Sequence, residues 1–212
     1  MLANRIHLHR LLVVAVVGVT AALGACSADN PDDTDPTATA SDTQTTPTGL
    51  RWQPFQGIAL PVTDQGPHRI DAAVASGFDR SPVGAALAAT QASVRISVAN
   101  DGQWPRIGAA MLAAGPRRDA WAVARARISI TAPITDGGPK LLGYHITRYN
   151  PDATDVDLYA LHPDNSVTRH HTAVLWQHED WRLVLPDTNP AAVPAVAAVA
   201  VTPPELVAFE PR

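Results

Sequence analysis

The alternation of apolar and polar residues in the second half of the chain constrains its fold more than any other feature. Four segments separated by turn residues alternate with the two-residue period of β-strands: 141–149, 154–161, 167–176 and 181–185. A shift of one residue between neighbouring strands would bring polar side chains onto the apolar face, so that face fixes the register. The sequence therefore predicts an antiparallel meander with one buried face.

Loop lengths that keep this face apolar give the register. A three-residue loop at 150–152 places Ile146 beside Val156, a three-residue loop at 163–165 places His170 beside Leu158, and a four-residue turn at 177–180 places Trp176 beside Trp181. The residues that then share one face are Leu142, Tyr144, Ile146, Val156, Leu158, Ala160, His170, Thr172, Val174, Trp176, Trp181, Leu183 and Leu185.

The segments before the strands favour helices. Ser81 followed by Pro82 is a helix start, with Ser as the cap and Pro in the first turn. Shorter helices are predicted at 105–114 and 117–128, whereas three residues of Pro or Gly make 52–62 extended. The predicted fold class is α+β, with N-terminal helices packed on a four-stranded antiparallel meander sheet.

The beginning of the sequence reads as an export signal. Arg5 and Arg10 precede an uncharged run of 15 residues, 11–25, which is shorter than the roughly 20 apolar residues of a spanning helix. The run ends in Leu23-Gly24-Ala25-Cys26, which resembles the lipobox of bacterial lipoproteins. That resemblance implies cleavage before Cys26, diacylglycerol on its sulfur, and a protein anchored on the extracytoplasmic face of the cell membrane. The alternative is a spare thiol beside an ordinary cleavage site.

Composition divides the chain into four parts. Residues 1–25 are the predicted lipoprotein signal peptide, and 26–49 a disordered tether, because 27–49 contain five Asp and no aromatic residue, Leu, Ile or Val. Residues 50–187 are the predicted globular domain. Residues 188–212, rich in Pro and Ala, are predicted to be a strap on its surface, with Leu206 and Phe209 as anchors.

Charge and cysteine content exclude several classes of protein. The chain has 16 Lys and Arg against 20 Asp and Glu, a net charge of −4, which argues against a partner with a phosphate backbone, so no nucleic acid is expected. One cysteine excludes an intrachain disulfide and a cysteine-rich zinc site. No cofactor is predicted.

Several short segments together resemble an uncharacterised domain family of actinobacterial lipoproteins and membrane-linked proteins, often associated with integrative conjugative elements. They are Gly57-Ile58-Ala59-Leu60-Pro61, Gly66-Pro67, Ala75-Ser76-Gly77-Phe78, Ser81-Pro82-Val83-Gly84-Ala85-Ala86, Asp119-Ala120-Trp121 and Trp181-Arg182-Leu183-Val184-Leu185-Pro186. The resemblance implies an envelope location and a link to transfer machinery, but no catalytic residue. Helices followed by a curved meander are also similar to the cone-shaped nuclear-transport-factor-like and cystatin-like folds.

The histidines are candidates for three roles: lining a pocket, acting as a catalytic base, and binding a metal. Tyr144, Leu158, His170 and Trp176 share the apolar face and are the candidate pocket. His170 there would act as a general base, but Asp157 lies on the opposite face and leaves it without an orienting carboxylate.

Metal binding is not predicted from the histidines. His170 lies on one face while His145 and His171 lie on the other, so the adjacent pair 170–171 does not chelate one ion. The sequence also lacks the HExxH spacing of a helical zinc site.

A basic cluster is the candidate partner surface. It consists of Arg117, Arg118, Arg125 and Arg127, and the alternative is a solvated helix face. The leading hypothesis is a non-enzymatic, lipid-anchored accessory or scaffold of an envelope or conjugative-transfer apparatus. The alternative is a small-ligand-binding protein or enzyme that uses the pocket around His170.

Overall fold

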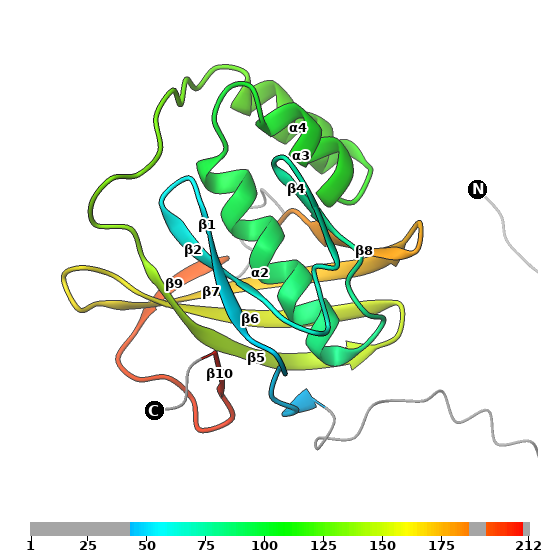
Figure 1. The fold of residues 1–212 in the computed structure, drawn as a ribbon, viewed down its shortest axis with the longest axis vertical. Helices are drawn as coiled ribbons and strands as arrows, with labels where there is room; N and C mark the ends of the chain where they lie inside the picture. Colours follow the sequence, from blue (N-terminus) through cyan, green and yellow to red (C-terminus); the bar gives the residue numbers. More distant parts are fainter. Residues whose placement is uncertain (1–42, 187–193, 210–212) are drawn as a thin grey trace, which may run out of the picture. The chain divides into compact units, whose positions relative to one another are not determined.

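The computed structural model describes residues 43–186 and 194–209 (Figure 1). Two hairpins come first, then three helices, a four-stranded meander and two short strands. The strands are β1 (Arg51–Phe55), β2 (Ile58–Val62), β3 (Arg69–Asp71), β4 (Val74–Ser76), β5 (Lys140–Asn150), β6 (Ala153–Leu161), β7 (Val167–Gln177), β8 (Asp180–Val184), β9 (Val196–Val199) and β10 (Val207–Ala208).

The prediction that helices come first is wrong, because hairpins β1–β2 and β3–β4 precede them. The segment expected to be extended folds back at Gln56 and Gly57, both of which have positive φ, and so pairs with itself. Pro54 and Pro61 are tolerated because a two-stranded ribbon has only edge strands.

The helices are α2 (Pro82–Val98), α3 (Trp104–Met111) and α4 (Pro116–Arg125). The predicted start of α2 is confirmed: the Ser81 hydroxyl accepts a hydrogen bond from the backbone N–H of Gly84, and Pro82 occupies the first turn. Of the described residues, no helix is long and apolar enough to cross a membrane.

The main sheet has six strands, in the order β10-β5-β6-β7-β8 with β9 also on β7. The expected four-stranded meander, β5 to β8, forms its centre, but the prediction of four strands is wrong. The described part of the expected C-terminal strap adds β10 to the edge strand β5, and adds β9 to residues 167–170 of β7, which β8 does not reach.

The strand register is as predicted at most positions. Ile146 faces Val156, Leu158 faces His170, and Trp176 faces Trp181. The first loop differs, because Asn150 pairs with Ala153 and the extra residue forms a bulge between Ile146 and Arg148. A second bulge places Leu141, not Leu142, opposite Ala160.

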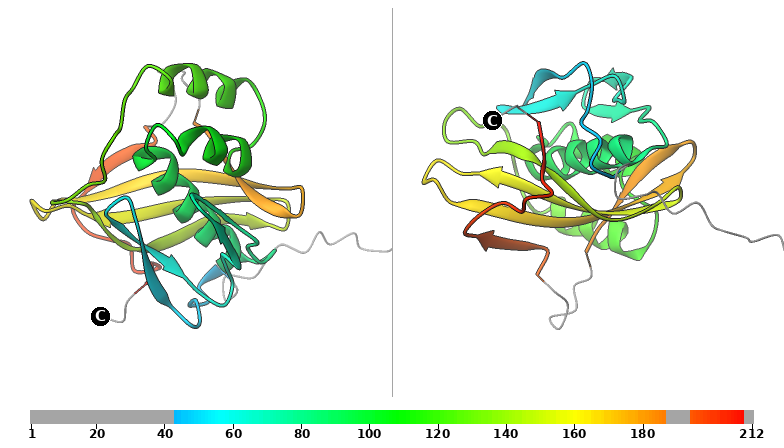
Figure 2. Two further views of the ribbon diagram at one scale, coloured as in Figure 1. Left: turned by 45° about the horizontal axis from the view of Figure 1, so that its top comes forward. Right: turned by 90° about the horizontal axis from the view of Figure 1, so that it is seen from below.

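Helix α2 covers the inner face of the sheet (Figure 2). Five alanines on α2 are at most 2% exposed: Ala85, Ala86, Ala88, Ala89 and Ala92. Such small side chains let the helix lie close to the strands. Leu87 from the helix and Tyr144 and Val156 from the sheet are fully buried in the core.

A buried arginine joins α2 to the hairpins. Arg95 is 2% exposed and donates hydrogen bonds to the Gln91 side chain and the Ala73 carbonyl oxygen. Its guanidinium carbon lies 4.4 Å from the ring centroid of Phe55. Burial lowers the pKa of Arg95 to about 10.

The predicted signal peptide, Cys26 and most of the expected tether lie outside the described residues. Residues 43–49, the last part of that tether, contact the domain instead of leaving it. The Asp64 N–H donates to the Thr48 carbonyl oxygen at 2.9 Å, and the Tyr144 hydroxyl donates to the Thr45 carbonyl oxygen at 3.3 Å.

Candidate functional site

The four residues of the predicted pocket do not line a common cavity in the described part of the chain. Tyr144 is fully buried and Leu158 is 6% exposed, because α2 fills the inner face at this point. Trp176 stacks edge to face on Trp181, with ring centroids 5.3 Å apart. Of the four predicted residues, His170 is the one that lines a cavity in the described part of the chain.

The cavity at His170 has a volume of about 230 Å³. It lies between α2, which contributes Ser93 and Ile96, and the end of β8, which contributes Leu183, and the guanidinium-bearing Arg117 also lines it. Burial, and to a smaller extent the neighbouring His171, lowers the pKa of His170. A neutral imidazole has both a donor and an acceptor nitrogen for a small polar molecule.

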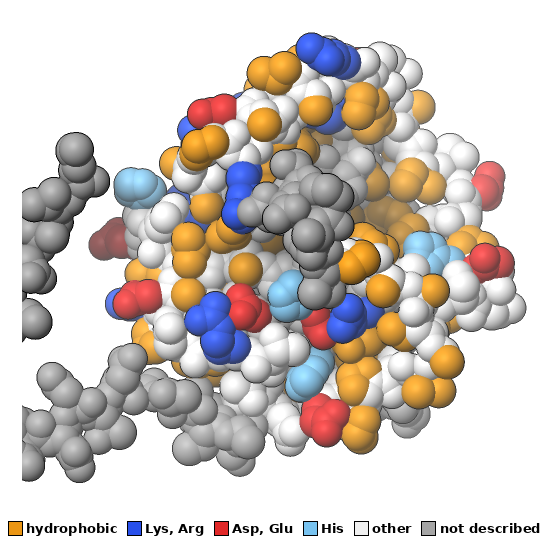
Figure 3. Space-filling model, turned by 180° about the vertical axis from the view of Figure 1, so that it is seen from behind, with side chains coloured by type: hydrophobic (Ala, Val, Ile, Leu, Met, Phe, Trp, Pro, Cys, Tyr) orange, Lys and Arg blue, Asp and Glu red, His pale blue; other side chains and the backbone are white. Residues whose placement is uncertain are grey.

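A carboxylate–imidazole pair lies on the opposite face of the sheet. His171 Nδ1 lies 2.7 Å from Oδ1 of Asp157, whose side chain is only 7% exposed, and Arg169 lies 3.8 Å from the other oxygen. His145 is opposite Asp157 on β5. Figure 3 shows histidines gathered with side chains of both charges on this face.

This pair was not predicted, although alternation had placed Asp157 and His171 on one face. The Asp157 carboxylate fixes the orientation of the His171 imidazole ring, as a carboxylate does for a catalytic base. The His171 side chain is 45% exposed. Among residues 43–186 and 194–209, no group of three His, Cys, Asp or Glu side chains converges as metal ligands.

The four arginines of the predicted partner surface have different environments. Arg125 is 5% exposed and donates to the carbonyl oxygens of Ala99 and Ile128, so it holds α4 on the domain. Arg117 donates to the carbonyl oxygen of Leu185. Arg127 is exposed, and Arg118 lies 3.6 Å from Asp119.

An apolar groove of about 780 Å³ lies beside the start of β5, between hairpin β1–β2 and the C-terminal segment 201–208. Its lining is Trp52, Gly57, Ala59, Gly138, Pro139, Lys140, Leu141, Leu142, Val167, Val201, Thr202, Leu206 and Ala208. Lys140 is the single charged residue in this lining. A predominantly apolar concavity with few polar groups is the usual form of a small-molecule site.

A second groove of about 810 Å³ adjoins the first. It is lined by 202–209 together with Gln44, Thr46, Pro47 and Leu50, so it shares Thr202, Leu206 and Ala208 with the apolar groove. The C-terminal segment therefore separates two hollows, one of which borders the residues that lead from the N-terminal part of the chain into the domain.

One feature of the sequence marks the position of the apolar groove. Lys140 is the single lysine of the chain, and it stands between Gly137-Gly138-Pro139 and Leu141-Leu142. The other walls come from residues about 80 positions before it and 60 after it, which local patterns do not connect.

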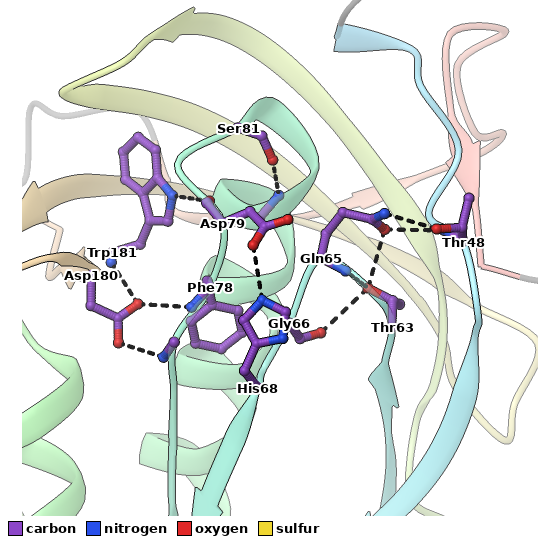
Figure 4. Close-up of polar contacts among 12 residues, drawn as sticks. Thr48, Thr63, Gln65, Gly66, His68, Phe78, Asp79, Ser81, Asp180 and Trp181 are labelled. Atoms are coloured by element: carbon purple, nitrogen blue, oxygen red, sulfur yellow. Dashed lines mark hydrogen bonds and ion pairs between the residues drawn. The ribbon is translucent and has the colours of Figure 1, made fainter.

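Four of the six segments that carry the family resemblance, those that contain Gly66, Phe78, Ser81 and Trp181, meet at the N-terminal end of α2 (Figure 4). The carboxylate of Asp180 accepts hydrogen bonds from the backbone N–H groups of Gly77, Phe78 and Trp181. The Trp181 indole donates to the Asp79 carbonyl oxygen at 2.9 Å. This junction joins β4, α2 and β8, so it has a structural role.

Two further contacts complete the junction. His68 Nε2 lies 2.9 Å from the Asp79 carboxylate. A Cβ atom on Gly84 would lie 2.1 Å from the Asp79 carbonyl oxygen, so this turn of α2 requires glycine.

One family model matches residues 17–201, and it is described as a domain of unknown function (DUF8175). The matched region begins inside the apolar run that precedes Cys26 and ends within the lining of the apolar groove. Searches of curated proteins and of solved structures found no match, so the similarity to cone-shaped folds stays a prediction.

Proposed function

We propose that this chain, which belongs to the family described as a domain of unknown function (DUF8175), is a non-enzymatic protein anchored by a lipid on Cys26 to the extracytoplasmic face of the cell membrane. It acts there as an accessory or scaffold of an envelope or conjugative-transfer apparatus. The observation that carries the proposal is the segment Leu23-Gly24-Ala25-Cys26 at the end of an uncharged run of 15 residues.

The way the chain enters the domain supports this arrangement. The Thr48 N–H donates to the Gln65 side chain at 3.0 Å, and the Thr48 hydroxyl donates to the Asp64 carboxylate at 3.0 Å. Residues 43–49 are therefore fastened, and 27–42 separate Cys26 from the fastened part. The tether proposed for 27–42 has 16 residues, and a flexible chain of that length reaches about 20 to 24 Å, which would keep the domain close to the membrane surface.

Acylation gives such an anchor its strength. Each buried CH₂ group contributes about 0.8 kcal/mol, so the two chains of a diacylglycerol hold a protein far longer than one chain does.

Fractionation of the full chain tests the anchor. The wild-type chain is expected in the membrane fraction and to leave it only with detergent. The variant Cys26→Ser should keep its signal peptide or move to the soluble fraction. A Cys26→Ser chain that is processed and still membrane-bound would refute lipidation.

The scaffold role predicts a partner surface on α4 and the residues after it. Arg118 and Arg127 are the members of the basic cluster to reverse, because Arg125 is structural and Arg117 contacts the end of β8. Cross-linking in membranes, followed by capture of the full chain, should recover an envelope protein. The double variant Arg118→Glu, Arg127→Glu should lose it, while Arg51→Glu, an exposed charge on β1, should not. Recovery of no envelope protein would remove the scaffold role.

A second candidate function is binding of a small polar molecule at His170. The observation that favours it is the cavity of about 230 Å³ between α2 and β8, where a neutral imidazole meets apolar walls. A ligand screen by thermal shift should find compounds that stabilise the wild-type chain but not His170→Leu. Equal stabilisation of both chains would place the ligand elsewhere.

A further inference from the structure

We propose that the apolar groove binds one long-chain fatty acid, with its carboxylate at Lys140 and its hydrocarbon chain between hairpin β1–β2 and segment 201–208. This inference adds a ligand to the proposed function. It uses the membrane anchor only as the reason why lipid is nearby.

The apolar walls of the groove come from three parts of the chain that are distant in sequence. Trp52 and Ala59 belong to hairpin β1–β2, Leu142 to β5, and Val201 and Leu206 to the C-terminal segment. Val201 is 79% exposed, the highest exposed fraction among the large hydrophobic side chains of the described residues. A bound hydrocarbon chain would remove this surface from water.

The polar groups of the groove distinguish a fatty acid from a peptide. The polar side-chain groups of the lining are the Lys140 ammonium, the Thr202 hydroxyl and the Trp52 indole N–H, and the other lining residues have apolar side chains or are glycine. A buried peptide backbone needs a donor or an acceptor for each of its polar groups, whereas an alkyl chain needs none. A single cation among mainly apolar lining side chains therefore fits a ligand with one anionic group and a long apolar tail.

Lys140 is placed to meet such a group. Its side chain is exposed at the first residue of β5, and within the described residues it makes no ion pair. A carboxylate at the ammonium group would form a charge-assisted hydrogen bond at the wet end of the groove, where the charge costs little desolvation.

The walls are held in place by contacts between the C-terminal segment, β1 and β5. The ring of Phe209 packs on Trp52 at 6.0 Å and on Tyr144 at 5.6 Å between centroids, and the Phe209 N–H donates to the Leu142 carbonyl oxygen at 3.0 Å. Two residues of β10 pair with Gly143 and Tyr144. The C-terminal segment is thus held against β5 by packing and hydrogen bonds, so the groove exists before a ligand binds.

Photolabelling of the full chain in membranes tests the proposal. The probe is a saturated 16-carbon fatty acid with a photoreactive diazirine in its alkyl chain, added to membranes that contain the chain, and labelled positions are mapped by mass spectrometry. Labels are expected in residues 138–142 and 201–208. Ala59→Trp, which places a large ring on an exposed groove position, should reduce labelling about tenfold.

Charge reversal tests the carboxylate site. Lys140→Glu should reduce labelling by the fatty acid about fivefold, as expected for loss of one exposed ion pair. It should leave labelling by the matched alkyl alcohol probe unchanged. Arg69→Glu, an exposed cation on β3 outside the groove lining, is the control for net charge and should behave as the wild-type chain.

Three results would overturn the proposal: labels that map outside the groove, labelling that Ala59→Trp leaves unchanged, and equal loss of both probes in Lys140→Glu. The same experiment distinguishes failure of the lipid anchor from failure of the groove proposal. In Cys26→Ser the probe is supplied to whichever fraction contains the chain, so the groove is expected to be labelled whether or not the protein is membrane-bound.

Discussion

The inner face of the main sheet and the apolar groove beside β5 are both rich in apolar side chains, but only the first is covered. On the inner face Tyr144 is fully buried because α2, with its row of alanines, lies against the strands. In the groove Val201 is 79% exposed, and no helix of the described residues lies over it. Apolar side chains alone therefore do not identify a binding site. A surface is available to a ligand only where no other element of the fold covers it.

The covered face depends on one junction. Asp180 accepts hydrogen bonds from the backbone N–H groups of Gly77 and Phe78 in the segment before α2, and Ser81 caps the helix that follows. The groove walls are joined instead by the pairing of β10 with β5 and by the packing of Phe209 on Trp52. Substitutions at the two regions should therefore separate stability from binding.

Loss of the Asp180 carboxylate should have the largest effect. The side chain is 6% exposed, so Asp180→Ala leaves three buried or half-buried N–H groups without their acceptor. We expect the free energy of unfolding to fall by about 3 to 5 kcal/mol. Urea unfolding followed by tryptophan fluorescence measures it, with the exposed Asp136→Ala as control. Equal stability of the two variants would show that the junction does not hold α2.

A methyl group on Gly84 should loosen the same region without removing a polar group. Gly84→Ala puts Cβ against the Asp79 carbonyl oxygen, so α2 or the preceding turn must move, and we expect a loss of about 1 to 3 kcal/mol. Gly102→Ala, whose nearest neighbour is 3.5 Å away, is the matched control. Chemical denaturation of both variants gives the comparison, and no difference between them would contradict the close approach.

Removal of the helix cap should cost less. Ser81→Ala leaves the Gly84 N–H without its side-chain acceptor, and we expect a loss of about 1 kcal/mol. Ser81→Asp should restore most of it, because a carboxylate also caps a helix and favours its N-terminus. Thermal unfolding of the three chains gives the order. A destabilised Ser81→Asp would mean that the hydroxyl has another role.

Protonation of His170 should weaken the covered face slightly. Burial lowers the pKa of His170 in the folded chain from 6.5, so the unfolded chain binds the proton more readily. The free energy of unfolding should therefore fall as the pH decreases below about 6.5 and stay low below the folded pKa. In His170→Gln this contribution should be absent. Denaturation curves at pH 7 and pH 5 measure the difference, and parallel pH dependences would contradict it.

Substitutions in the groove should change stability least. Ala59 and Lys140 are exposed, so Ala59→Trp and Lys140→Glu should each alter the free energy of unfolding by no more than about 0.5 kcal/mol. Unfolding curves beside those of the Asp180 variant give the contrast between the two regions. A loss comparable to that of Gly84→Ala would show that the groove is part of the core.

The sequence predicted the centre of the fold well because local rules act there. Alternation and the requirement for one apolar face gave the pairs of β5 to β8, and Ser81-Pro82 gave the start of α2. The bulge after Ile146 was missed because a bulge and a longer loop lead to the same pairs further along the strands.

The edges of the fold were harder to predict for a different reason. Strands β9 and β10 have four and two residues in a segment rich in Ala and Pro, too short for a periodic pattern. The groove needs Trp52, Lys140 and Leu206 together, and only tertiary packing brings them there. Alternation and register place Asp157 and His171 on one face, but the contact between them also depends on side-chain rotamers, which the pattern does not give.

The intact mass of the full chain released from membranes tests the central claim, a protein held at the membrane by its own lipid. The account predicts a polypeptide that begins at Cys26 and carries the additional mass of a diacylglyceryl group. A chain with an unmodified Cys26 thiol, or one that retains residues 1–25, would contradict it.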